Sequence, residues 1–276
     1  MKKFVTSSLV LTTIAIYLFV SAPAQLPDGI RGSQKSISIE KALKILATQQ
    51  DEARALYTAE IVSAGSKAGL KFGEQWKRDE VEEGPLPALL LREVASNIRK
   101  TEVPLGLFLG SDYPISPSNM FNSDQMGSYL KVKESGSPIF FSTGNQGATT
   151  AMFPDFASAQ GCVTCHNEHP TSPKLDWKLQ DIMGATTWTY PKSSVSPDEL
   201  AEMLQALRSS VREAYSTYIE KTSRFKNPPS IGNKWPRDGY SLPTPDEFIA
   251  ELDRRSGSIL NSLLESLTSK HEGNRS

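Results

Sequence analysis

The amino-acid sequence predicts an α+β fold in which an antiparallel sheet follows a long N-terminal helix and precedes further helices. Apolar residues recur at helical spacing over about residues 38–68. Short apolar runs bounded by Gly, Pro, Ser and Asn begin at residue 104, as in the strands of a small antiparallel sheet. Helical spacing returns after residue 196. We therefore expect an α+β domain over residues 38–192 and a helical C-terminal extension over residues 193–276.

The first part of the chain, residues 1–24, has the pattern of a signal peptide. Lys2 and Lys3 precede a mostly apolar stretch over residues 4–20, and small residues ending at Ala24 supply an A-x-A cleavage pattern. We expect cleavage after Ala24, a linker over residues 25–37, and a periplasmic location for the rest of the chain. Without cleavage the apolar stretch would anchor the chain in the membrane, since its length is at the short limit of the roughly 17–25 residues that span a bilayer.

Two helices are expected before the sheet. Ser38 suits the N-cap of the helix over residues 38–68, and Gly69 suits its end. Pro85 and Pro87 open a second helix, over about residues 85–100, which has one apolar face.

The predicted strands cover residues 104–110, 137–142 and 149–153, and one or two closing strands lie within residues 177–190. Gly184 within the last segment is expected to form a bulge or a turn. Between the first two strands lies a turn-rich connection with one short helix.

The extension is expected to hold two helices. Ser196 and Thr244 are good N-caps for these helices. The proline- and glycine-rich residues 222–243 between them are expected to form either an ordered loop or a linker. The apolar stripes of these helices suit a core, and they would also suit helix pairing between protomers in a homodimer.

The composition narrows the class of function. A net charge of -1 and a pI near 6.4 imply no basic face for nucleic acid. A mean hydropathy of -0.35 indicates a soluble globular protein rather than a polytopic membrane protein. The sequence contains no Ser/His/Asp set, phosphate loop or carboxylate pair at a spacing that suits catalysis, so we do not expect an enzyme.

The segment Cys162-Val163-Thr164-Cys165-His166 contains both cysteines of the chain. C-x-x-C-H is the attachment signature of a c-type haem. The two thiols bind the haem vinyl groups as thioethers, and His166 coordinates the iron as the proximal ligand. A redox-active dithiol would not need the histidine, and a structural zinc site needs about four ligands. We therefore expect one covalently bound haem c.

Other groups are candidates for contact with this haem. Lys174 and Trp177 follow the motif closely and suit a propionate partner and a packing contact. His169 is only three residues from His166 and is poorly placed to reach the opposite face. The distal ligand is open, with Tyr57, Met120, Met126, Met152 and Met183 as candidates.

Five features together carry a family resemblance: residues 51–62 (DEARALYTAEIV), 84–91 (GPLPALLL), 109–121 (LGSDYPISPSNMF), 162–181 (CVTCHNEHPTSPKLDWKLQD) and Gly184. They resemble the bacterial c-type haem domains with a PAS-like fold, which occur alone or as sensory ectodomains of histidine kinases, nucleotide cyclases and chemoreceptors. The resemblance covers about residues 50–192. It departs at Gln180, where such domains usually carry glycine. Some relatives use a distant cysteine as second haem ligand, and this chain has no cysteine left for that role.

The resemblance implies a PAS-like antiparallel sheet and a sensory function. We expect a periplasmic monohaem protein that senses redox state or a small diatomic ligand. Because no effector sequence follows the domain, the signal would pass to a partner protein. The alternative is a monohaem cytochrome that carries electrons to and from a redox partner.

Overall fold

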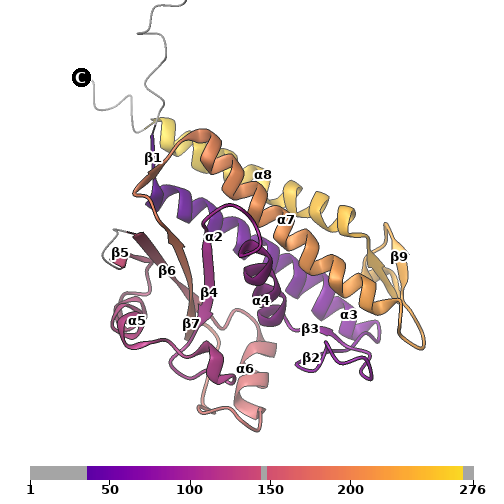
Figure 1. Ribbon diagram of the computed structural model, residues 1–276. Coiled ribbons are helices and arrows are strands. Elements are labelled where there is room, and N and C mark those ends of the chain that lie inside the picture. Colours follow the sequence, from indigo (N-terminus) through magenta and orange to yellow (C-terminus); the bar gives the residue numbers. More distant parts are fainter. Residues whose placement is uncertain (1–35, 144–147, 270–276) are drawn as a thin grey trace, which may run out of the picture. The chain divides into compact units, whose positions relative to one another are not determined.

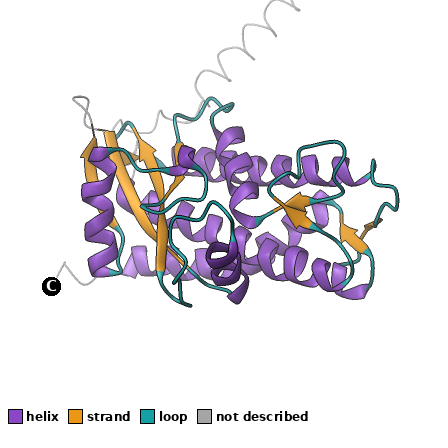
Figure 2. Ribbon diagram, turned by 90° about the horizontal axis from the view of Figure 1, so that it is seen from below, coloured by secondary structure: helices purple, strands orange, loops and turns teal. Residues whose placement is uncertain are grey.

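The computed structural model describes residues 36–143 and 148–269, and the predicted signal peptide lies outside them, as does nearly all of the predicted linker. From Ile37 onward the chain forms one compact unit of helices and a mainly antiparallel set of strands (Figures 1 and 2). The α+β class is confirmed. Within the described part, no helix combines the length and the apolar character that crossing a membrane requires.

The expected long N-terminal helix is present but changes its winding. After strand β1 (Ile37–Ser38) come the α-helix α2 (Ile39–Leu56), the π-helix η2 (Tyr57–Ser63) and the short α-helix α3 (Ala64–Lys67). Ser38 is the N-cap, as predicted, and its side chain accepts a hydrogen bond from the Lys41 amide at 3.4 Å. Gly69 follows the last turn with a φ of +100°, a conformation that glycine adopts without a steric cost, so the predicted end of the helix is confirmed.

A pair of two-residue strands precedes the second helix. Strands β2 (Phe72–Gly73) and β3 (Gly84–Pro85) form a parallel pair, and α4 (Pro87–Ile98) begins directly after Leu86. A proline at the first helical position has no amide hydrogen to leave unpaired, which explains why the helix begins there.

The main sheet has four strands, β4 (Gly106–Gly110), β5 (Ile139–Thr143), β6 (Ala148–Phe156) and β7 (Ile182–Tyr190). Their spatial order is β4-β7-β6-β5, and all neighbouring pairs are antiparallel. The connection from β4 to β5 contains a 3₁₀ turn, η3 (Pro117–Asn119), and the helix α5 (Ser123–Ser135). The sequence predicted one short helix in this connection, and α5 is that helix, more than three turns long. Asn122 and Gln125 form its capping box.

The two faces of the sheet pack against different helices. On β6, Ala151 lies in the large core cluster that includes the α2 residues, and the next residue, Met152, lies in a second cluster with Tyr129 and Val132 of α5. This alternation follows from the two-residue period of a strand, which sends successive side chains to opposite faces.

Two details of the closing strand differ from the prediction. Residues 177–181 form no strand, because hydrogen bonds to Asn167 and Asp181 hold their backbone in a loop. Gly184 does not form the bulge, because it pairs with Asp155 in the regular ladder. The bulge lies at the next pair, where Phe156 pairs with Ile182 and Met183 is left as the extra residue.

The C-terminal helices belong to the same core as the domain before them. Helix α7 (Pro197–Thr222), opened by a capping box of Ser196 and Glu199, packs on α4 and α2, and α8 (Pro245–Ser269) packs on α2 and α7. The rings of Tyr215 on α7 and Phe248 on α8 are stacked with centroids 4.4 Å apart. Buried residues of α7 and of the first part of α8 therefore belong to the same core cluster as those of α2.

The segment between α7 and α8 is ordered, in agreement with one of the two expectations for it. It contains the parallel pair β9 (Ser230–Gly232) and β10 (Ser241–Pro243) with a 3₁₀ turn, η4 (Pro236–Asp238), between them. A further two-residue strand, β8 (Ser194–Val195), pairs with β1 and brings the start of α7 beside the start of α2.

Gly184 lies where the sheet leaves no room for a side chain. A Cβ added there would lie 2.3 Å from the carbonyl oxygen of Gly110 on β4, a backbone atom that cannot rotate away. We expect Gly184→Ala to lower the free energy of unfolding by about 1–3 kcal/mol, measured by urea denaturation.

The matched control is Gly127→Ala in α5, where an added Cβ would meet nothing within 4 Å. Alanine is a better helix former, so this variant should be about 0.5–1 kcal/mol more stable than the parent. Equal stability of the two variants would contradict the packing described for β4 and β7.

Candidate functional site

The C-x-x-C-H motif lies on a short helix, α6 (Gln160–Glu168), which begins four residues after β6 ends. Figure 1 shows α6 at the end of the sheet remote from β1. Cys162, Cys165 and His166 are spaced by three and four residues, so they share one face of this helix. Both thiols are free and partly exposed. The sequence did not reveal this helix, because the motif has no apolar periodicity.

A small apolar cluster lies beside the motif. It consists of Ala157, Val163, Trp177 and Met183, with Cys162 packed against it. The rings of His166 and Trp177 meet edge to face, with centroids 6.4 Å apart and an interplanar angle of 87°. Trp177 is thereby placed beside the histidine; its packing against the haem stays a prediction.

Asn167 fixes the position of Trp177. Its side-chain oxygen accepts a hydrogen bond from the Trp177 amide at 2.8 Å, and its side-chain nitrogen donates to the Trp177 carbonyl at 3.0 Å. Two bonds to one residue hold the loop after α6 against the helix.

Lys174, the predicted propionate partner, pairs with a neighbouring carboxylate in the structure. Its ammonium contacts the carboxylate of Asp176 and lies 4.7 Å from the centre of the Trp177 ring. Asp176 is mostly exposed, so this ion pair is of the weak surface kind and leaves the lysine free to change partner.

Gln180 has a φ of 70°, and no other non-glycine residue in the described part of the chain has a positive φ. Hydrogen bonds impose this conformation: the Gln180 amide donates to the Ala157 carbonyl at 3.1 Å, and the Ala157 amide donates to the Asp181 carbonyl at 2.9 Å. The turn therefore requires the left-handed conformation that the glycine of similar domains would adopt easily. The departure in sequence leaves the turn in place.

The surroundings of His166 favour its neutral form. Burial lowers the pKa of His166, while the carboxylate of Asp155 acts in the opposite direction. Its Nδ1 atom is buried and has no hydrogen-bond partner among the described residues. Burial also raises the pKa of the Cys165 thiol, with a further contribution from Glu74. A neutral imidazole is the form that coordinates a metal.

Both ring nitrogens of His169 have polar partners, Thr171 and Glu74. Its Nδ1 accepts a hydrogen bond from the Thr171 amide at 3.2 Å, and its Nε2 lies 3.3 Å from a carboxylate oxygen of Glu74. These contacts hold its ring toward Glu74.

The structure brings one of the five distal candidates into the cluster beside the motif, Met183. Tyr57 is fully buried in the large helical core, where its hydroxyl donates to the Pro85 carbonyl at 2.7 Å and burial raises its pKa well above the usual value. Met152 is buried in the α5 cluster, Met126 packs against that cluster, and Met120 is half exposed.

The groups around the motif fit a haem. Two free thiols and a histidine share a helix face, and the Trp177 indole nitrogen is buried without a partner among the described residues. Large apolar side chains beside the motif in sequence are exposed, among them Phe156 (37%), Leu175 (61%) and Leu179 (51%). A bound macrocycle would cover surface of this kind. In the described part of the chain, no three His, Cys, Asp or Glu side chains are grouped to hold a metal ion.

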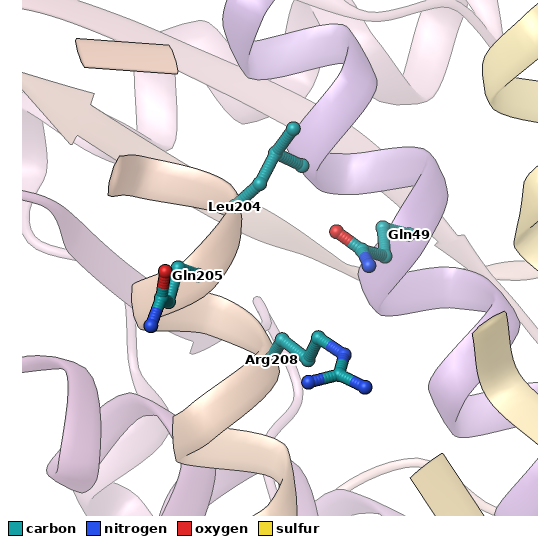
Figure 3. A pocket seen from close by; sticks show the side chains of 4 residues that line it. All are labelled: Gln49, Leu204, Gln205 and Arg208. Atoms are coloured by element: carbon teal, nitrogen blue, oxygen red, sulfur yellow. The ribbon is translucent and has the colours of Figure 1, made fainter. Parts of the chain in front are cut away.

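A hollow of about 340 Å³ lies between α2 and α7 (Figure 3). Gln49, Leu204, Gln205 and Arg208 line it, and none of these residues belongs to the motif or its cluster. The candidate site therefore lies at α6 and not in this hollow.

Comparison with known proteins gave one match. The family model described as Tll0287-like matches residues 34–191, which is more than half of the chain. No curated protein and no solved structure matches this chain significantly.

Gln180 offers a test of the turn that closes the site. A left-handed conformation costs a non-glycine residue roughly 1–2 kcal/mol. We expect Gln180→Gly to raise the free energy of unfolding by up to about 1 kcal/mol, after the greater freedom of glycine in the unfolded chain is subtracted. Gln180→Val should lower it by about 1 kcal/mol or more, because β-branched residues adopt this conformation least readily. A valine variant as stable as the parent in urea denaturation would contradict the turn.

Proposed function

Because the chain belongs to the Tll0287-like family, a family of c-type haem sensory-like domains, we propose that it is an exported monohaem protein that senses redox state or a small diatomic ligand. One observation carries the haem assignment. The two thiols and the histidine of the C-x-x-C-H motif share one face of α6, with the indole of Trp177 beside the histidine.

The roles of the residues follow from their chemistry. Cys162 and Cys165 would hold the haem by thioether bonds, each formed by addition of the S–H group across one vinyl double bond. His166 would coordinate the iron in its neutral form. The haem supplies one-electron redox chemistry and an iron site for a sixth ligand.

The sensory proposal rests on where the site sits in the fold. A three-residue connection leads from β6 to α6, β6 contacts α2, and α2 contacts both C-terminal helices. A change at the iron therefore has a packed route to helices that a partner protein could contact, and signalling requires only that the two states of the haem favour different arrangements of this route. A binding protein of this kind needs no catalytic residues, and we propose that the chain is not an enzyme.

The alternative function, a monohaem electron carrier, is favoured by Met183. Its thioether lies in the same cluster as Cys162, and a methionine ligand would give the six-coordinate iron that an electron carrier uses.

We expect the exported protein to carry haem that survives denaturation, because thioether bonds are covalent. A denaturing gel stained for haem peroxidase activity should show a band near the mature mass. Cys162→Ser combined with Cys165→Ser should abolish the band, whereas His166→Ala in matured protein should keep it and change the absorption spectrum. Haem that extracts from the parent protein into acidified organic solvent would contradict covalent attachment.

Carbon monoxide separates the two functions. A sensor with a displaceable sixth ligand should bind CO in the ferrous state, which shifts the Soret band. A carrier with Met183 on the iron should ignore CO as the parent protein and bind it as Met183→Leu. Met152→Leu, in the separate cluster with Tyr129 and Val132 of α5, is the matched control and should behave as the parent does. A ferrous protein that ignores saturating CO in every variant rules out both the sensor with an open site and the methionine ligand.

A further inference from the structure

A half-buried ion pair joins the long helix to the strand that leads into the C-x-x-C-H motif. The Arg54 guanidinium on α2 lies 2.5 Å from the carboxylate of Asp155, the last residue but one of β6. Their side chains are only 23% and 17% exposed. Asp51, one helical turn before Arg54, lies 3.9 Å from the same guanidinium with a side chain 55% exposed. Arg54 is thus held between an inner and an outer carboxylate.

The ion pair lies at the end of β6 that leads into the motif. Asp155 pairs with Gly184 across the sheet, next to Met183 in the chain. Ala157, two residues after Asp155, belongs with Met183 to the apolar cluster against which Cys162 packs. The charges of Asp155 and Arg54 would therefore act on an iron bound at the motif.

We propose that the Arg54–Asp155 ion pair couples the oxidation state of the haem iron to the attachment of α2 on the sheet. The inference rests on the haem site proposed above and names the way in which that site is read out. Only an electron moves: ferric iron takes one electron from an external one-electron donor and becomes ferrous, and no bond in the ion pair is made or broken.

The sign of the coupling follows from Coulomb's law. Ferric iron carries one more positive charge than ferrous iron, so it attracts Asp155 and repels Arg54. The ferric state therefore holds Arg54 less tightly in its place against β6, and the ferrous state holds it more tightly. Because the coupling is reciprocal, Arg54 must favour the ferrous state and Asp155 must favour the ferric state.

Potentiometric titration of haem-loaded variants tests this reciprocity. Asp155→Asn removes the negative charge and should raise the midpoint potential, whereas Arg54→Gln removes the positive charge and should lower it. The double variant should return close to the parent value. A purely structural role would predict shifts of the same direction in both variants, since each would loosen the same contact and admit water. Shifts of one sign, or no shift, would overturn the inference.

Two controls make the test specific. Arg54→Lys keeps the charge and should leave the potential nearly unchanged. Arg208→Gln and Asp253→Asn break a bidentate ion pair between α7 and α8, whose side chains are 47% and 44% exposed, and should cause no shift.

A second measurement needs no variant. Hydrogen exchange of the backbone amides of α2 around Arg54 should be faster in the ferric than in the ferrous parent protein, and Arg208 and its neighbours on α7 should show no such difference. Equal exchange of α2 in both states would overturn the coupling. A parent protein without haem absorption would instead overturn the proposed function, so the two failures are distinguishable.

Discussion

The packing of α2 between the sheet and the C-terminal helices is the constraint on which the rest of the structure depends. One side of α2 contacts β6 and β7, where Trp188 and Ala151 are completely buried, and other residues of the helix contact α7 and α8. Leu43, Leu46 and Leu56 of α2 are likewise fully buried. Burying a leucine side chain contributes roughly 1.5–3 kcal/mol to stability. The contacts of α2 therefore stabilise the packing of the predicted domain, residues 38–192, against the C-terminal helices.

Local sequence signals predicted most of the fold. Ser38, Pro87, Ser196 and Gly69 mark helix ends through hydrogen bonds and backbone conformations that involve only neighbouring residues, so they could be recognised from the sequence. The shared core was missed because it depends on contacts such as Tyr215 with Phe248 and β1 with β8, which local patterns do not encode.

The candidate site also combines features that local sequence encodes with contacts between residues far apart in the chain. The motif, and Trp177 close after it, could be recognised from the sequence because these residues lie within a short stretch of the chain. Arg54, Asp155 and Glu74 could not be, because they come from distant segments and an isolated charged residue is most often a solvated one. Among the five distal candidates, sequence offered no means of choosing. The structure places Met183, the extra residue at the irregularity of β7, in the cluster beside the motif, and Met152 in the α5 cluster.

The proposed function depends on a single haem that is bound through both Cys162 and Cys165. The absorption spectrum of the pyridine haemochrome tests this attachment, because the position of the α-band depends on how many vinyl groups have been converted to thioethers. We expect the spectrum of a haem with two thioether bonds in the exported parent protein, and that of a single thioether in Cys162→Ser and in Cys165→Ser. A spectrum with both vinyl groups intact in the parent protein would contradict it.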